Sequence, residues 1–264
     1  MNAMTGVLLA AVFAVASGAE AQGTLASRVN AVKDGRVRFT LSPREGVCGN
    51  GMSWFRKRDG SFSGTVINGN WSGSRDVEAT CDRGPVRVVV VKKDSEIAEI
   101  RHYVGGTWKA DTGITDLGQI NTRDAGTWLL NLAETGTTKP ARQAMSVATI
   151  TDSIDATATL LRIVKNTERP SDVRASALNW LGESVGDKLT LNLDSVAYAA
   201  DDREVRKQAI YGISRRPVEE AVPSLLKMAE TLPDRELRRT AVYWLVQSKD
   251  PRAIAWVEKQ VAGR

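Results

Sequence analysis

Apolar and polar positions in the C-terminal half of the chain recur with a period of 32 residues. The segment 171–177 has counterparts at 203–209 and 235–241. In each copy the apolar residues follow a spacing of i, i+4 and i+8, which forms one stripe along an amphipathic helix. A fixed period of this size predicts stacked helical units rather than one closed core.

A second apolar marker extends this array. Segment 125–135 matches 221–231 at an offset of 96 residues, which is three times the period. The marker positions at successive multiples of the period are Leu129, Leu161, Leu193, Leu225 and Val257. We therefore predict a lone helix near 125–134 followed by four helix pairs, within a repeat region that covers 117–264.

Residues 22–110 have a different pattern, which predicts β structure. Alternation of polar and apolar residues over 36–41 indicates a half-buried strand, and the Val-rich run 85–91 precedes a second run at 96–103. The short polar segment between the two runs predicts a hairpin. A Gly- and Ser-rich stretch separates the first strand from this hairpin, so we expect a small antiparallel sheet with one long excursion.

The repeat motif resembles that of a known family. The pattern Asp-x-x-apolar-Arg-x-x-Ala begins at Asp202 and again at Asp234, and 171–182 carries a variant of it. It resembles the HEAT repeat, in its short form of about thirty residues. The resemblance implies an α-solenoid of HEAT-like helix pairs, here preceded by the small antiparallel β domain.

The N-terminal residues predict export. Residues 7–16 are apolar, too few to span a bilayer, and a small-x-small pattern at 19–21 precedes Gln22. We expect a signal peptide over 1–21, cleavage before Gln22, and a periplasmic or secreted protein. The alternative is a buried core helix, because the first five residues contain no Lys or Arg. No other stretch is long and apolar enough to predict a transmembrane anchor.

The chain contains two cysteines, Cys48 and Cys81. In an exported protein two cysteines most simply form one disulfide. A reactive or metal-binding thiol pair is the alternative, but the chain has one histidine, His102, and no Cys-x-x-Cys motif. We expect His102 to face solvent or to be satisfied in the core, and we expect no metal or other cofactor.

One arginine recurs in each repeat. Arg174, Arg206 and Arg238 are spaced by 32 residues. They could form a row of guanidinium groups for a phosphate or carboxylate ligand. The favoured interpretation is structural, since in HEAT-like arrays this Arg pairs with acids of the neighbouring repeat. The acids available for this are Asp202, Glu204, Asp234 and Glu236, and the two Asp residues are also placed to cap helices.

Aromatic residues recur at two positions of the repeat. Trp180 and Trp244 lie on the apolar stripe, so we expect core packing. Tyr211 and Tyr243 lie away from the stripe, where partly exposed aromatic rings are candidates for protein contact. The other contact candidates, on second helices, are Trp256, Lys227 and Lys259.

No catalytic motif accompanies the repeats. The net charge of +5 comes from basic residues interleaved with acidic ones, so we expect no nucleic-acid partner. The sequence favours a non-enzymatic exported scaffold that binds another protein through its repeat surface. A second hypothesis is a tetrapyrrole-lyase-like or other ligand-handling HEAT-type enzyme or chaperone, although the repeats contain no Cys or His.

Overall fold

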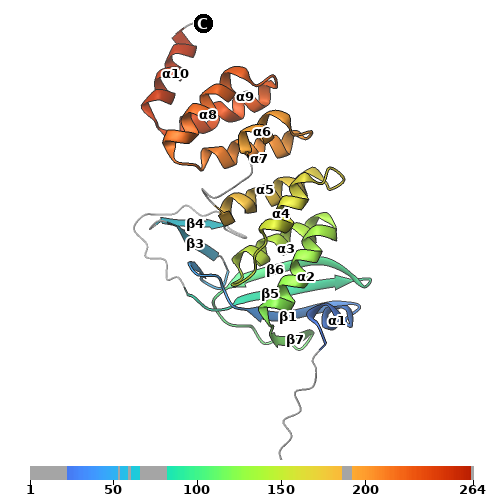
Figure 1. Ribbon diagram of the computed structural model, residues 1–264. Helices are drawn as coiled ribbons and strands as arrows, with labels where there is room; N and C mark the ends of the chain where they lie inside the picture. The colour runs from blue at the N-terminus through green and yellow to red at the C-terminus, as the bar shows by residue number, and fades with distance from the viewer. Residues whose placement is uncertain (1–22, 53, 59–60, 66–81, 186–191, 263–264) are drawn as a thin grey trace, which may run out of the picture.

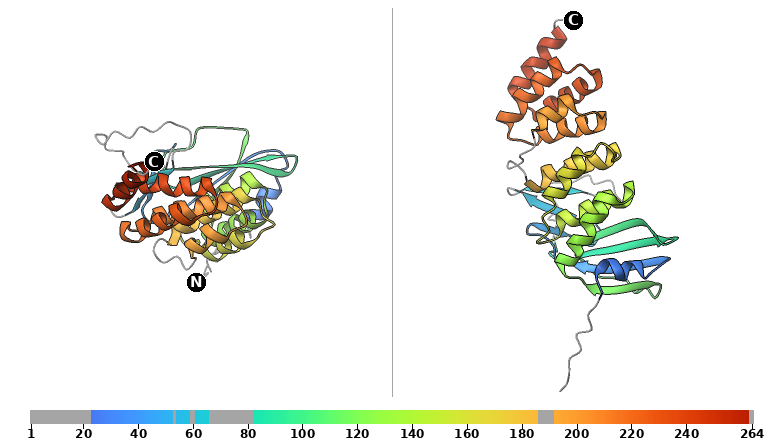
Figure 2. Two further views of the ribbon diagram at one scale, coloured as in Figure 1. Left: turned by 90° about the horizontal axis from the view of Figure 1, so that it is seen from above. Right: turned by 45° about the vertical axis from the view of Figure 1, so that its right-hand side comes forward.

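The computed structural model describes residues 23–52, 54–58, 61–65, 82–185 and 192–262, and it places a small β part at one end of a line of stacked helices (Figures 1 and 2). The predicted signal peptide and Cys81 lie outside the described residues. Among the residues described, no helix has the length and apolar character needed to span a bilayer.

The larger sheet has four strands, in the order β6-β5-β1-β7. They are β1 (Gly35–Leu41), β5 (Val86–Lys93), β6 (Glu96–Val104) and β7 (Ile114–Gln119). β5 pairs antiparallel with both β1 and β6, which confirms the first strand and the hairpin. β7 instead lies parallel to β1, so the sheet is mixed and extends beyond the expected boundary at residue 110.

Strand β5 is buried on both faces, which explains its run of valines. Val86, Val88 and Val90 are fully buried on one face, and Val89 on the other face is only 8% exposed. The β5–β6 turn is formed by Asp94 and Ser95, both with positive φ, as a tight two-residue hairpin turn requires.

The Gly-rich excursion contains a second, three-stranded antiparallel sheet. Its strands are β2 (Val47–Gly49), β3 (Trp54–Arg58) and β4 (Ser61–Thr65), in that order. Gly49 and Asp82 exchange two backbone hydrogen bonds, of 2.9 and 2.8 Å, which tie β2 to the start of the segment that leads into β5.

A short helix, α1 (Leu25–Asn30), precedes the sheet where the sequence pattern indicated only β structure. Its Leu25 and Val29 are fully buried. The Leu25 amide donates a hydrogen bond of 2.6 Å to the Asp124 carboxylate, so α1 is fastened to the first helix of the array.

Nine further helices follow within the described part of the chain, as one lone helix and four pairs. They are α2 (Thr122–Thr135), α3 (Thr138–Ile150), α4 (Thr157–Lys165), α5 (Ser171–Val185), α6 (Leu193–Ala199), α7 (Arg203–Ser214), α8 (Val218–Thr231), α9 (Arg235–Ser248) and α10 (Pro251–Ala262). The first helices of the pairs, α3, α5, α7 and α9, pack on one another in sequence. This order confirms the predicted α-solenoid.

The apolar stripe is the core of the array. Val173, Ala177 and Leu181 are fully buried, and their counterparts one and two repeats later are at most 1% exposed. Asp202 and Asp234 cap α7 and α9 by accepting hydrogen bonds from the amides two and three residues ahead, as expected.

Helix α3 joins the array to the sheet. It packs on β6, and the chain after β1 bonds to the end of α3 through the amide of Arg44 and the carbonyl of Ile150, at 2.8 Å. Buried side chains of the sheet and of the helices form one continuous cluster. The helices therefore extend from the sheet and share a core with it, and α10 lies at the far end (Figure 2).

Candidate protein-contact surface

The arginine ladder contacts the ends of the preceding helices. Each ladder arginine donates to a carbonyl in the last turn of the preceding second helix or at the residue that follows it. The three bonds are Arg174 Nε to Val164 O (3.1 Å), Arg206 Nε to Ala197 O (2.8 Å) and Arg238 Nη1 to Leu232 O (2.5 Å). These carbonyls have no partner within their own helix, and a cation is favourable at this end of the helix dipole. The ladder is thus a structural feature of the repeat.

The acidic partners differ from those expected. Among the described residues, Arg174 is the ladder arginine that pairs with a carboxylate, that of Asp201, through two bonds of 2.9 and 2.7 Å. The hydrogen bond from Arg174 lowers the pKa of Asp201. Asp202 and Asp234 instead cap helices, so the expected pairing of these acids with the ladder is wrong.

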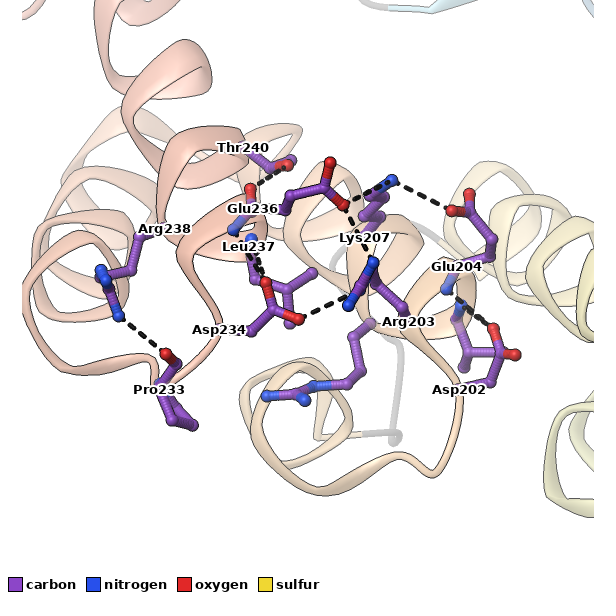
Figure 3. Close-up of polar contacts among 12 residues, drawn as sticks. Asp202, Arg203, Glu204, Lys207, Pro233, Asp234, Glu236, Leu237, Arg238 and Thr240 are labelled. Carbon is purple, nitrogen blue, oxygen red and sulfur yellow. Dashed lines mark hydrogen bonds and ion pairs between the residues drawn. The ribbon is translucent and has the colours of Figure 1, made fainter.

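A different arginine bridges neighbouring repeats, as Figure 3 shows. Arg203 Nε lies 3.0 Å from Asp234 Oδ2, and its Nη1 lies 3.2 Å from Glu236 Oε2. Lys207 Nζ adds a bond of 3.0 Å to Glu204 within α7 and lies 3.9 Å from Glu236. Exposed ion pairs of this kind stabilise weakly one by one, and here they join α7 to the start of α9.

The two repeated tyrosines both contact one tryptophan. Trp244 packs against Tyr211 of α7, with ring centroids 5.1 Å apart, and against Tyr243 of its own helix at 4.9 Å. Tyr211 is therefore half-buried at the contact between repeats, whereas Tyr243 is 55% exposed. Trp180, at the position equivalent to Trp244, is buried instead, because it contacts Trp54 of β3.

The second-helix candidates lie near the end of the array. Trp256 is half-buried, and its Nε1 donates to Glu230 Oε1 at 2.7 Å, while Lys227 and Lys259 are exposed. Trp256 and Glu230 belong to a groove of about 710 Å³ between α8, α9 and α10. The groove is also lined by Ala229, Arg235, Arg238, Arg239, Val242, Val257, Gln260 and Val261. The two lysines do not line it.

The sequence pattern did not indicate a buried polar cluster at the junction of sheet and array. Trp54 Nε1 donates to His102 Nε2 at 3.1 Å, and Ser146 Oγ lies 3.0 Å from the same nitrogen. Because an indole N–H can only donate, His102 Nε2 is the unprotonated nitrogen of a neutral ring. Burial lowers the pKa of His102 to about 4. Since the indole already occupies this nitrogen, we assign His102 a structural role, in agreement with the core-satisfied alternative.

One of the two cysteines of the predicted disulfide lies within the described residues. Cys48 lies on β2 and is 7% exposed, whereas Cys81 is outside the described residues. The bonds between Gly49 and Asp82 join the chain neighbours of both cysteines. The described residues contain no group of three or more His, Cys, Asp or Glu side chains that could hold a metal ion.

Comparison with known families identifies the repeats at the end of the array. Residues 193–263, which begin at α6 and include α7 to α10, match the family model of the HEAT repeats. No curated protein matches the chain. The matched segment contains Arg203, Asp234 and Trp244, and with them the contacts between α7 and α9. The chain is therefore a HEAT-repeat-containing protein.

Proposed function

We propose that this protein is an exported, non-enzymatic scaffold that binds another protein through the C-terminal part of its HEAT-repeat array. The observation that carries the proposal is the distribution of exposed apolar side chains. Of the six large apolar side chains that are exposed among the described residues, five lie on α8, α9 and α10. They are Val218 (44%), Tyr243 (55%), Val246 (51%), Ile254 (48%) and Val261 (70%).

This clustering favours a binding surface over chance exposure. Single exposed apolar residues are ordinary on protein surfaces, whereas contiguous apolar patches mark interaction sites. Helix α10 contributes strongly, because Ala253 is its one fully buried residue while Ile254 and Val261 are exposed. The neighbouring groove adds arginines, which together with aromatic rings are enriched where proteins meet.

Export is supported by the apolar N-terminal segment and by the two cysteines, of which Cys48 is buried on β2. It is tested by expressing the full chain in a bacterial host and measuring the intact mass of the protein recovered from the periplasm. A mature protein that begins at Gln22 is expected. A protein that stays in the cytoplasm with its first 21 residues attached would contradict export.

Binding is tested with the purified protein immobilised and exposed to the extracytoplasmic fraction of its host. A double variant, Tyr243→Ala with Ile254→Ala, removes two exposed apolar side chains without touching the buried stripe. We expect the retained partner to fall about tenfold or more, since apolar anchors dominate the binding energy of interfaces. Met52→Ala is the matched control, because Met52 is 67% exposed and lies outside the array. Binding at the C-terminal part of the array would be refuted if the intact protein retained no partner. It would also be refuted if Met52→Ala lost as much partner as the double variant.

A further inference from the structure

The outer face of α9 repeats the face of α7 that α9 itself covers. Arg203, Ile210 and Tyr211 of α7 have counterparts on α9, 32 positions later in the sequence. The counterparts are Arg235, Val242 and Tyr243. Ile210 is fully buried under the next repeat, whereas Val242 is only half-buried. The two faces therefore carry the same chemistry, but among the described residues only that of α7 is covered by a following first helix.

Helix α9 shows what such a face binds. The capping Asp234 and the first-turn Glu236 of α9 lie 3.0 and 3.2 Å from the Arg203 guanidinium (Figure 3). Two and a half turns further along, its Trp244 ring packs on Tyr211 with a centroid distance of 5.1 Å. The contact between repeats thus combines an acidic first turn, which meets an arginine, with an aromatic ring ten residues after the capping Asp.

The equivalent groups on α9 are available. Arg235 is exposed and makes no ion pair with any described residue, and Tyr243 is 55% exposed. Arg235 and Val242 line the groove of about 710 Å³ beside α10. The acidic side chain of that groove, Glu230, already accepts a hydrogen bond from Trp256. The groove thus combines apolar side chains with an excess of positive charge.

We propose that this face of α9 binds an amphipathic helix of another protein. The helix would carry an Asp at its N-cap, a Glu two residues later and an aromatic residue ten positions after the Asp. This inference rests on the proposed function and names the partner's chemistry. A second copy of this chain fits less well, because its first-helix candidate at the sheet end, α3, has no acid in its first turn and is packed on β6.

The chain supplies its own probe, because α9 is a helix that binds such a face. The peptide has the sequence of residues 233–248 with Arg239→Lys and Tyr243→Asp, and a lactam between these two new side chains holds it helical. It keeps the two acids and the tryptophan. The bridge is needed since isolated helices of this length are marginal in water, and it lies on the exposed side of α9. Binding to the full-length protein is followed by fluorescence anisotropy of the labelled peptide.

We expect the peptide to bind the intact protein saturably. The affinity should fall about fivefold or more when the protein carries Arg235→Glu or Tyr243→Ala. It should fall by a similar factor when Asn and Gln replace the two acids of the peptide. Arg123→Glu is the matched control, because Arg123 is also an exposed first-turn arginine, on α2. Thermal unfolding of each variant checks that the fold is intact.

Three results would overturn the inference. One is the absence of peptide binding by the intact protein, and another is equal binding by the Arg235→Glu and Arg123→Glu variants. The third is a dimer, detected by sedimentation velocity, that becomes a monomer with Arg235→Glu, since a second copy would then occupy the face.

If a host partner is retained but its binding is insensitive to Arg235→Glu, this inference fails and the scaffold function stands. If no host partner is retained at all while the peptide binds, the scaffold function fails instead.

Discussion

Trp54 of β3 stacks on Trp180 of α5, with ring centroids 6.1 Å apart and an angle of 26° between the ring planes. These residues come from the two parts of the molecule that the sequence pattern separated. Trp54 also donates to His102 of β6, so the contact ties the smaller sheet, the larger sheet and the array together. The array therefore packs directly against both sheets.

Replacing Trp180 by Ala should destabilise the protein by about 3 kcal/mol or more, because the ring is 8% exposed and its removal leaves a cavity beside Trp54. Urea unfolding measures this change. Trp244→Ala is the control at the equivalent repeat position, and it should cost less since Trp244 is only half-buried. Equal costs for the two variants would mean that the junction does not depend on this stacking.

Stability should fall between pH 7 and pH 5 because of His102. Its pKa is lowered to about 4 in the folded protein, below the usual value near 6.5 in the unfolded chain. The unfolded chain therefore binds more protons in this range, so stability is fully present above pH 6.5 and is lost as the pH falls towards 4. Linkage gives a loss of about 2 kcal/mol from pH 7 to pH 5.

This pH dependence is measured by urea unfolding at several pH values, with His102→Gln as the comparison. The glutamine does not titrate, and its amide oxygen can still accept from Trp54. We expect the variant to show a flatter profile between pH 5 and pH 7. An unchanged slope in the variant would assign the effect to another group.

The ladder arginine Arg174 should matter more than its acidic partner. Arg174→Leu leaves the buried Val164 carbonyl without its donor, which should cost about 1–3 kcal/mol. Asp201→Asn should have a smaller effect, because Asp201 is exposed and the carbonyl contact remains. Thermal unfolding of both variants checks the order, and a larger loss with Asp201→Asn would show that the ion pair dominates.

The predicted Cys48–Cys81 disulfide should stabilise the protein by about 3–4 kcal/mol in the chain-entropy model, given the length of loop that it closes. Thiol titration of the unreduced, denatured protein should find no free thiol. Treatment with a reductant should then lower the melting temperature, and the Cys48→Ser variant should melt at the lower temperature with or without it. Two titratable thiols in the protein recovered from the periplasm would contradict the bridge.

Much of the array could be predicted because its determinants are local. The apolar stripe that begins at Val173 and the caps Asp202 and Asp234 each act within one helix, and the 32-residue period relates neighbouring helix pairs. Each repeat can therefore be predicted from its own sequence. The candidate site was predicted less well. The exposure of Tyr243 follows from its helix position, but the groove beside Trp256 depends on how far α10 stands from α8 and α9.

The sequence by itself determined the helix pairs, their order and the residues that face the core, because repeated spacing and caps are properties of neighbouring residues. Tertiary structure alone decided that β7 joins the sheet parallel to β1, that Arg203 rather than Arg206 meets the acids of the next repeat, and that Trp54 meets Trp180. The physical reason is that these contacts join residues far apart in the chain. Their partners are selected by the packing of whole elements, in which many side chains compete for the same surface.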